Sequence, residues 1–230
     1  MDNITLKRLS YEANMELYRR GLVLYTWGNV SQIDRAREVF AIKPSGVPYD
    51  ALAPEMMVLI DMMTGAPIDS AHKPSSDTPT HLALYRAFSE IGGVTHTHSP
   101  AATAWAQARR AIPCLGTTHA DYFRGEIPVA RLLTQSEVEA DYEAATGRAI
   151  IEAFSGKDPV HTPGALCAGH GLFTWGKDAA EAVHNAVVLE EIAKIAMWTQ
   201  TLSHDAPALP AHVSEKHFSR KHGPNAYYGQ

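Results

Sequence analysis

The chain of 230 residues is long enough to bury one sizeable core, and its 45% hydrophobic and 20% charged residues are ordinary for a globular protein in water. The formal net charge of −5, with histidine neutral, excludes a global positive field that would attract nucleic acid or anionic lipid, so local groups must hold any anionic ligand. No apolar run approaches the length of a membrane span and the first residues lack a signal-peptide pattern, so we expect a cytoplasmic protein without nucleic-acid or membrane partners.

The first predicted element is an amphipathic helix, because apolar residues recur at three- and four-residue spacing from Leu6 to Leu17. Gly21 is expected to end this helix. Three strands follow, at residues 22–34 with a break at Gly28-Asn29, at residues 38–46 and at residues 56–65. The second of these strands runs into a Lys-Pro-Ser-Gly turn.

Residues 73–88 carry a clear helix start. Asp77 or Thr78 can cap this helix, and Pro79 fits its first position. The later elements are expected to be a strand at 91–99, a helix at 100–109, a strand at 164–176 and a long helix within 177–202 that Asp178 caps. The polar segment 215–230 has the composition of a mobile tail.

The order of these elements favours one α/β domain over residues 1–230. Strands and helices alternate irregularly, and several hairpins are expected early in the chain. We therefore expect a largely antiparallel or mixed sheet that helices cover. The sequence contains no internal repeat and no linker that would divide the chain.

Two histidines separated by one residue form the first candidate site. In a strand the side chains of His96 and His98 leave from the same face, roughly 7 Å apart. Both imidazoles can then reach one metal ion, although two polar residues on a solvated strand would have the same pattern. His170, expected in another strand between two glycines, would complete an open three-histidine site that suits zinc. Alone, His170 is more typical of a structural histidine.

Asp77, Ser75 and Ser76 precede the helix predicted at 73–88. Asp77 fits a helix cap, and its functional alternative is a carboxylate near the metal. The two serines can bind phosphate, because a helix N-terminus offers unpaired N–H groups and a favourable dipole.

A second candidate phosphate-binding segment lies in the Lys-Pro-Ser-Gly turn. We call this turn and the Ser75-Ser76 segment the two phosphate arms. The turn offers Lys43, Ser45 and the Gly46 amide, and a glycine lets the backbone approach an anion closely. An ordinary turn has the same residues, and this simpler interpretation would be preferred if the turn stood alone.

Proton donors and acceptors gather in two further segments. Asp121 lies in a loop rich in Thr and His, where a carboxylate can transfer protons or simply fix the loop. The tail adds His217, Arg220 and Tyr228, which are without consequence in a solvated tail but supply acids and an anion clamp if the tail covers a site.

Eight stretches occur in the order TWGNVS, IKPSGV, KPSSDTPTHLALY, GGVTHTHS, GTTHADYF, HGLFTWGK, AVHNAVVLEE and KHFSRKHGPNAYYGQ. Over Trp27–Gln230 the chain thereby resembles the L-ribulose-5-phosphate 4-epimerases, a family within the class II sugar-phosphate aldolase superfamily. The resemblance implies a single class II aldolase/epimerase-like domain with three α/β/α layers and a central, mostly antiparallel sheet. It also implies a homotetramer whose active sites lie at subunit interfaces.

The resemblance also implies roles for particular residues. One zinc ion per subunit, or another divalent metal, would bind His96, His98 and His170, with Asp77 at or beside the metal. The phosphate-binding region would comprise Asn29, Ser45, Gly46, Ser75 and Ser76. Asp121 and Tyr228 would be the acid/base pair, with His217 and Arg220 nearby.

The implied reaction interconverts L-ribulose 5-phosphate and D-xylulose 5-phosphate, which differ at C4. Because the ketone is at C2, the C4 hydrogen is not acidic, and the C3–C4 bond must break and re-form through an enediolate held by zinc. A class II aldolase would use the same metal chemistry, but typically has glutamate where Asp77 stands. A third hypothesis, a metal-stabilised oligomer or binding module, leaves the phosphate arms and the donor-rich tail unexplained.

Overall fold

The computed structural model describes residues 1–68, 71–223 and 226–227. Its centre is a seven-stranded sheet. The strands are β1 (Asn29–Asp34), β2 (Val39–Ile42), β3 (Val58–Asp61), β4 (Gly93–Thr97), β5 (Val129–Ala130), β6 (Gly164–Cys167) and β7 (Leu172–Gly176). They lie in the order β3-β2-β1-β4-β7-β6-β5, and the β5–β6 pair is parallel while the others are antiparallel.

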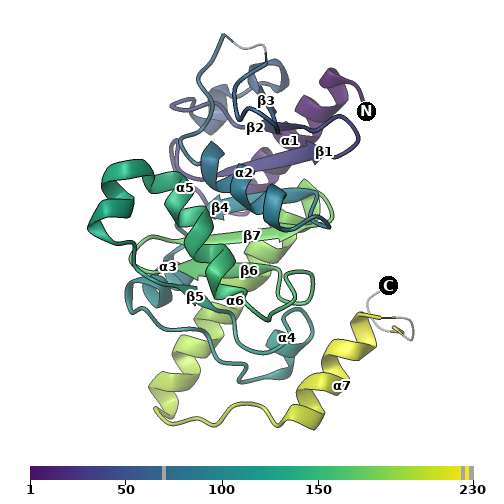
Figure 1. The fold of residues 1–230 in the computed structure, drawn as a ribbon. Helices are drawn as coiled ribbons and strands as arrows, with labels where there is room; N and C mark the ends of the chain where they lie inside the picture. The colour runs from purple at the N-terminus through teal and green to yellow at the C-terminus, as the bar shows by residue number, and fades with distance from the viewer. Residues whose placement is uncertain (69–70, 224–225, 228–230) are drawn as a thin grey trace.

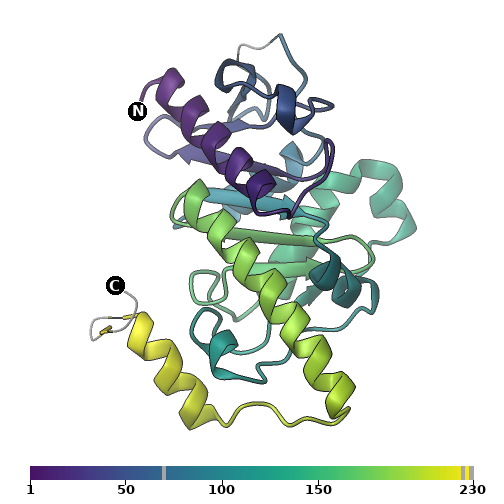
Figure 2. The same cartoon turned by 180° about the vertical axis from the view of Figure 1, so that it is seen from behind.

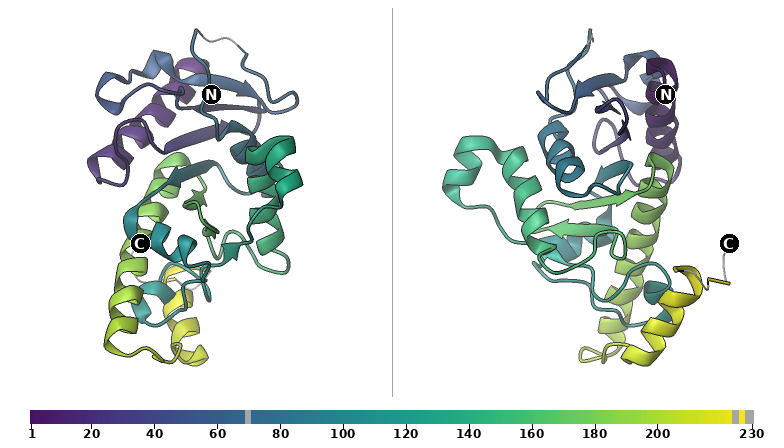
Figure 3. Two further views of the ribbon diagram at one scale, coloured as in Figure 1. Left: turned by 90° about the vertical axis from the view of Figure 1, so that its left-hand side faces the viewer. Right: turned by 45° about the vertical axis from the view of Figure 1, so that its right-hand side comes forward.

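Helices cover both faces of this sheet. They are α1 (Asn3–Arg19), α2 (Thr78–Ala87), α3 (Pro100–Gln107), α4 (Thr117–Ala120), α5 (Gln135–Ala153), α6 (Ala179–Leu202) and α7 (Ala211–Lys221), with 3-10 turns at Tyr49–Ala51 and Pro54–Met56. Helices α2 and α5 lie on the face seen in Figure 1, and α1 and α6 run along the opposite face in Figure 2. The side views in Figure 3 show the sheet between these helix layers. The predicted α/β/α domain with a mostly antiparallel sheet is confirmed. None of the described helices is long and apolar enough to cross a membrane.

The sheet separates two hydrophobic cores. Leu17, Trp105 and Leu189 belong to the core beneath α1, α3 and α6, whereas Leu84 and Ile150 belong to the core beneath α2 and α5. Successive residues of a strand point to opposite faces, so β7 contributes to both cores. A sheet buried on both faces fixes the register of its strands strongly, because a slip of one residue would exchange the two sets of side chains.

Several helix ends follow the sequence signals. Gly21, with φ 68°, ends α1, and Asp178 caps α6 by accepting a hydrogen bond of 2.8 Å from the Glu181 amide. Helix α5 begins at a capping box formed by Thr134 and Glu137. We predicted no helix there, although the Thr-x-x-Glu pattern is a signal that would have found it.

Three expectations about local structure were wrong. Residues 22–28 form a loop rather than a strand, because the chain turns at Tyr25 (φ 53°) and Gly28 (φ 70°). The strand expected at 164–176 is the hairpin β6–β7, and its turn contains Gly169 at φ 72°. Residues 215–221 of the segment expected to be a mobile tail belong to α7, which packs beside α4 at the lower right of Figure 1.

Gly93 in β4 lies where strand and helix meet most closely. A Cβ at Gly93 would overlap the backbone of Ala179 at the start of α6. We therefore expect Gly93→Ala to lower the free energy of unfolding by about 1–3 kcal/mol, the usual cost of overpacking. Gly116→Ala is the matched control, because a Cβ there meets no atom within 4 Å. Chemical denaturation would measure both, and equal stability of the two variants would contradict this view of the contact.

Candidate functional site

The candidate site forms at one end of the sheet, where β4 ends and its neighbours β1 and β7 begin. Asn29 pairs with His96 across β1 and β4, and Thr97 pairs with Leu172 across β4 and β7. The start of α2 reaches the same place, because Asn29 Nδ2 donates a hydrogen bond of 2.7 Å to the Asp77 carboxylate. Residues that are far apart in the sequence thus meet at one sheet end.

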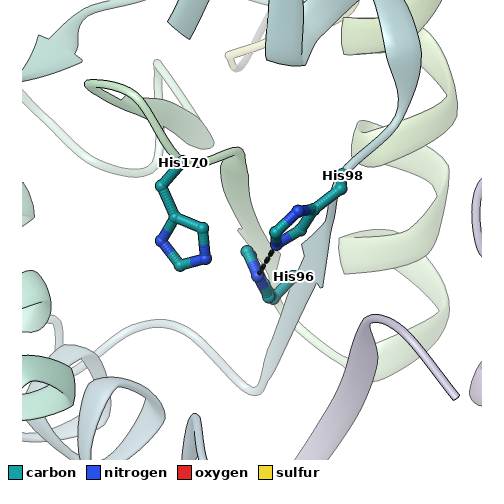
Figure 4. A group of neighbouring side chains, drawn as sticks. All are labelled: His96, His98 and His170. Carbon is teal, nitrogen blue, oxygen red and sulfur yellow. Dashed lines mark hydrogen bonds between the residues drawn. The ribbon is translucent and has the colours of Figure 1, made fainter. Parts of the chain in front are cut away.

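Three imidazoles converge there. His96 lies in β4, His98 lies just after that strand, and their Nε2 atoms are 3.0 Å apart. His170 lies in the turn between β6 and β7, not in a strand as we predicted, because Gly169 reverses the chain. One potential ligand atom from each of the three residues lies within 4.8 Å of the others. Figure 4 shows one ring nitrogen of His170 facing His96 and His98, and the other facing away.

The three imidazoles fit a divalent metal ion. Two nitrogens bound to a tetrahedral ion at about 2.0–2.1 Å are separated by roughly 3.3 Å, close to the observed separation of His96 and His98. Three imidazoles are the donor set of open zinc sites, which leave a position for substrate. Small movements of the side chains would therefore suffice to bind an ion.

Desolvation favours the neutral form of these imidazoles. Desolvation lowers the pKa of His96 and of His98, and it lowers the pKa of His170 to about 4, with the His96 charge acting in the same direction. Nearby Asp77 opposes all three shifts by favouring the protonated rings. Neutral imidazoles have free lone pairs at neutral pH, so a metal has few protons to displace.

The ring of His96 is held on two sides. Its Nδ1 lies 2.8 Å from the carbonyl oxygen of Leu172, and the ring stacks on Phe173 with centroids 4.2 Å apart. An outer partner on one ring nitrogen fixes the orientation of the other as a ligand. Gly171 permits this close arrangement, because a Cβ there would press on the Thr97 carbonyl and on the imidazole rings of His96 and His98.

Asp77 occupies the N-cap position of α2, but its side chain makes no capping hydrogen bond. It accepts instead from Asn29 and lies half-buried beside the histidines. Burial alone would raise the pKa of the Asp77 carboxyl, but the imidazoles of His96 and His81 and the Asn29 amide together lower it. The three-imidazole group within 4.8 Å does not include Asp77, so the structure places this carboxylate beside the group.

The two candidate phosphate arms lie side by side. The Ser45 amide donates to the Lys73 carbonyl and the Ser75 amide donates to the Lys43 carbonyl, at 2.9 and 3.0 Å. Gly46 has φ 72°, which favours glycine at this turn. The Lys43 ammonium donates to the Val47 carbonyl at 2.6 Å, so in this structure it braces its own loop.

A single cavity of about 350 Å³ connects the histidines with both arms. Ten of the eleven residues predicted to bind the metal or the phosphate line this cavity, namely Asn29, Lys43, Ser45, Gly46, Ser75, Ser76, Asp77, His96, His98 and His170. The eleventh, Arg220, does not line it. Asn29 links the two parts, because its Nδ2 donates both to Ser75 Oγ at 3.0 Å and to Asp77. Its buried Oδ1 has no hydrogen-bond partner among the described residues and can accept from a ligand hydroxyl.

Thr26 and Trp27 also line the cavity, although no role was predicted for either residue. Trp27 is 55% exposed. The signal that would have included both residues is the stretch TWGNVS, which carries Asn29 as well.

Asp121 and the tail residues form a separate cluster. Arg220 donates two hydrogen bonds to the Asp121 carboxylate, at 2.9 and 2.7 Å, and His217 Nδ1 lies 3.1 Å from it. Burial raises the pKa of Asp121, but the hydrogen bonds from Arg220 and His217 outweigh it and lower the value overall. None of these three residues lines the histidine cavity. Tyr228 lies outside the described residues.

We expect the purified protein to contain about one divalent metal ion per chain, as an open three-histidine site would. His96→Ala should lose this ion because two imidazoles hold it too weakly. His204→Ala is the control, since that histidine is exposed and pairs with Asp205. Elemental analysis would measure both variants, and full metal occupancy in His96→Ala would contradict the assignment.

Comparison with known proteins gives the family and the fold. The family model described as Class II Aldolase and Adducin N-terminal domain matches residues 8–197. Among solved structures, an L-fuculose 1-phosphate aldolase is 23% identical, with a TM-score of 0.79 over 94% of this chain and 95% of that chain. The L-fuculose-1-phosphate aldolase from Thermus thermophilus is 24% identical, with a TM-score of 0.67 over 89% of this chain and 98% of that chain.

A further structure with this fold is YgbL from Escherichia coli, a putative aldolase/epimerase/decarboxylase. It is 21% identical, with a TM-score of 0.71 over 93% of this chain and 98% of that chain. At such identities the likeness shows a shared fold, whereas the family model spans most of the chain. The protein therefore belongs to the class II aldolase and adducin N-terminal domain family.

Proposed function

We propose that this protein is a metal-dependent enzyme that breaks and re-forms a carbon–carbon bond in a sugar phosphate. The observation that carries the proposal is the single cavity in which three convergent imidazoles lie next to two hydroxyl- and amide-bearing arms. The imidazoles would hold the metal, and Ser45, Gly46, Ser75 and Ser76 would bind the phosphate. Asn29 lies between these groups and would bind a sugar hydroxyl, while Asp77 would lie at or beside the metal.

The more specific proposal is the interconversion of L-ribulose 5-phosphate and D-xylulose 5-phosphate at C4. A divalent ion, zinc or another metal, held by His96, His98 and His170 would supply a Lewis acid to stabilise the negative charge that develops when the C3–C4 bond breaks. The serine arms would keep the phosphorylated aldehyde in place while it turns to present its other face. The presence of aspartate at position 77, where a related aldolase typically has glutamate, favours this reaction.

Two proton-transfer groups are needed, because the C4 oxygen points in opposite directions in the two epimers. We assign them to Asp121 and Tyr228. Pairing with Arg220 lowers the pKa of Asp121, so the ionised carboxylate would take up the C4 hydroxyl proton in one direction of the reaction and return it in the other. Since the Asp121 cluster does not line the histidine cavity of its own chain, we propose that a neighbouring subunit of a homotetramer supplies it, with His217 and Arg220.

The competing proposal is aldol cleavage, because solved structures of the same fold are named L-fuculose 1-phosphate aldolases. A coupled assay with L-ribulose 5-phosphate and with L-fuculose 1-phosphate separates the two. We expect turnover of the first substrate, loss of activity with a chelator, and recovery when zinc is restored. Preference for L-fuculose 1-phosphate would overturn the epimerase proposal, and activity that a chelator leaves unchanged would overturn the metal role.

Tyr228→Phe and Asp121→Asn should each slow epimerisation by roughly 10²–10⁴-fold while the metal content stays at the wild-type level, because each removes one proton-transfer group. Steady-state kinetics and metal analysis of the same preparations would measure this. Wild-type turnover in either variant would remove that residue from the mechanism.

Mixed oligomers would test the interfacial site directly. If each site takes its histidines from one subunit and Asp121 from another, co-expressed His96→Ala and Asp121→Asn chains should form hybrids in which about a quarter of the sites are intact. Hybrids as inactive as either parent would contradict a shared site.

A further inference from the structure

His170 has a contact that the proposed reaction does not use. His170 lies in a turn between two glycines, so its backbone alone holds the ring weakly. The hydroxyl of Tyr142 lies 3.4 Å from His170 Nδ1, with ring centroids 6.0 Å apart. This is the ring nitrogen that faces away from His96 and His98 in Figure 4.

Tyr142 reaches this position because α5 is broken. Asp141 has φ −169° and ψ 91°, an extended conformation within the helix. The helix restarts at once, because the Asp141 carboxylate accepts a hydrogen bond of 3.1 Å from the Ala144 amide, as an N-cap does. Tyr142 is therefore the first residue of the second half of α5. Its ring lines a second cavity of about 210 Å³, whose wall it shares with His170.

One guanidinium bridges the break. Arg131 pairs with Glu137 in the first half of α5 and with Glu152 in the second half, with nitrogen–oxygen distances of 2.8 Å in both pairs. An isolated surface pair contributes little to stability, but an arginine that joins two helix segments fixes their relative direction. On the other side, Thr80 Oγ1 in α2 donates to the Glu143 carbonyl at 2.6 Å. The backbone beside Tyr142 is thus fixed from two directions.

We propose that Tyr142 is a positioning residue for the metal centre, and that Arg131 acts through it by holding α5 across its break. The phenol oxygen would accept the Nδ1 proton of His170 and so present Nε2 to the ion. The arrangement matches His96, whose Nδ1 lies 2.8 Å from the Leu172 carbonyl. Such outer partners of metal ligands typically change metal affinity by about 10–100-fold. This inference rests on the metal role within the proposed function.

The test measures metal affinity rather than catalysis. Wild type, Tyr142→Phe and the control Tyr18→Phe would be stripped with chelator and titrated with zinc against a chromophoric competitor. Tyr18 is a suitable control because its exposure, 41%, is close to the 37% of Tyr142 and its ring stacks on Tyr49 instead. We expect the zinc dissociation constant of Tyr142→Phe to rise about 10–100-fold, with thermal stability of the apoprotein unchanged.

Cobalt supplies a second readout, because its visible absorption reports ligand geometry. The spectrum of cobalt-loaded Tyr142→Phe should differ from wild type, and that of Tyr18→Phe should not. A wild-type zinc affinity in Tyr142→Phe would overturn the inference while leaving the proposed function intact. Failure of the substrate assay would overturn the proposed reaction while leaving the zinc titration interpretable.

A double-mutant cycle tests the part played by Arg131. If Arg131 acts through Tyr142, Arg131→Met should weaken zinc binding in the wild-type background and have little further effect in the Tyr142→Phe background. Additive losses, or no loss in the single Arg131→Met variant, would overturn its assignment as a positioning residue.

Discussion

The antiparallel register of β1, β4 and β7 is the constraint on which the site depends. It places Asn29, His96 and Leu172 on neighbouring strands at one end of the sheet, and the first two contribute side chains to the cavity. Because both faces of this sheet are buried, a slip of one residue would turn His96 into the opposite core. The close contact of Gly93 with the start of α6 helps to set that register.

Burial gives the candidate metal site its electrostatic character. Desolvation lowers the pKa of each of the three imidazoles, while Asp77 opposes that shift. The result is a group of neutral nitrogen donors beside a carboxylate that Asn29 keeps hydrogen-bonded. A divalent cation would satisfy both parts, since it would take the lone pairs and its charge would be balanced by the nearby carboxylate. The same burial leaves Asn29 Oδ1 without a partner among the described residues, so a sugar hydroxyl that reaches it meets an acceptor.

The sequence predicted the parts of the site that depend on local geometry. The spacing of His96 and His98 gives a shared face, and Pro79 after Asp77 marks the start of α2 at the cavity. The sequence did not predict that His170 lies in a turn, because strand-like residues continue on both sides of Gly169. Only the positive φ of Gly169 shows that the chain reverses there. Helix α7 was missed because its polar composition resembles a tail, and the pairing of its Arg220 with Asp121 joins residues that are far apart in the sequence. The break in α5 depends on one extended residue that no periodicity reveals.

The Asp121 cluster lies apart from the three histidines of its own chain, and this separation affects how Asp121 can act. Asp121 is already paired with Arg220 and His217 within its own chain, so its negative charge is compensated before any substrate arrives. Pairing of this kind lowers the pKa of the Asp121 carboxyl, which favours its ionised form but weakens it as a base. A reversible epimerisation needs a second proton-transfer group on the opposite side of the aldehyde, and the two groups exchange donor and acceptor roles between the two directions. We propose Tyr228 as this second group. In the proposed tetramer the packed pair of helices α4 and α7 would then form an already ordered part of the neighbouring site. Assembly would bring it to the metal centre of the next subunit without first having to order it.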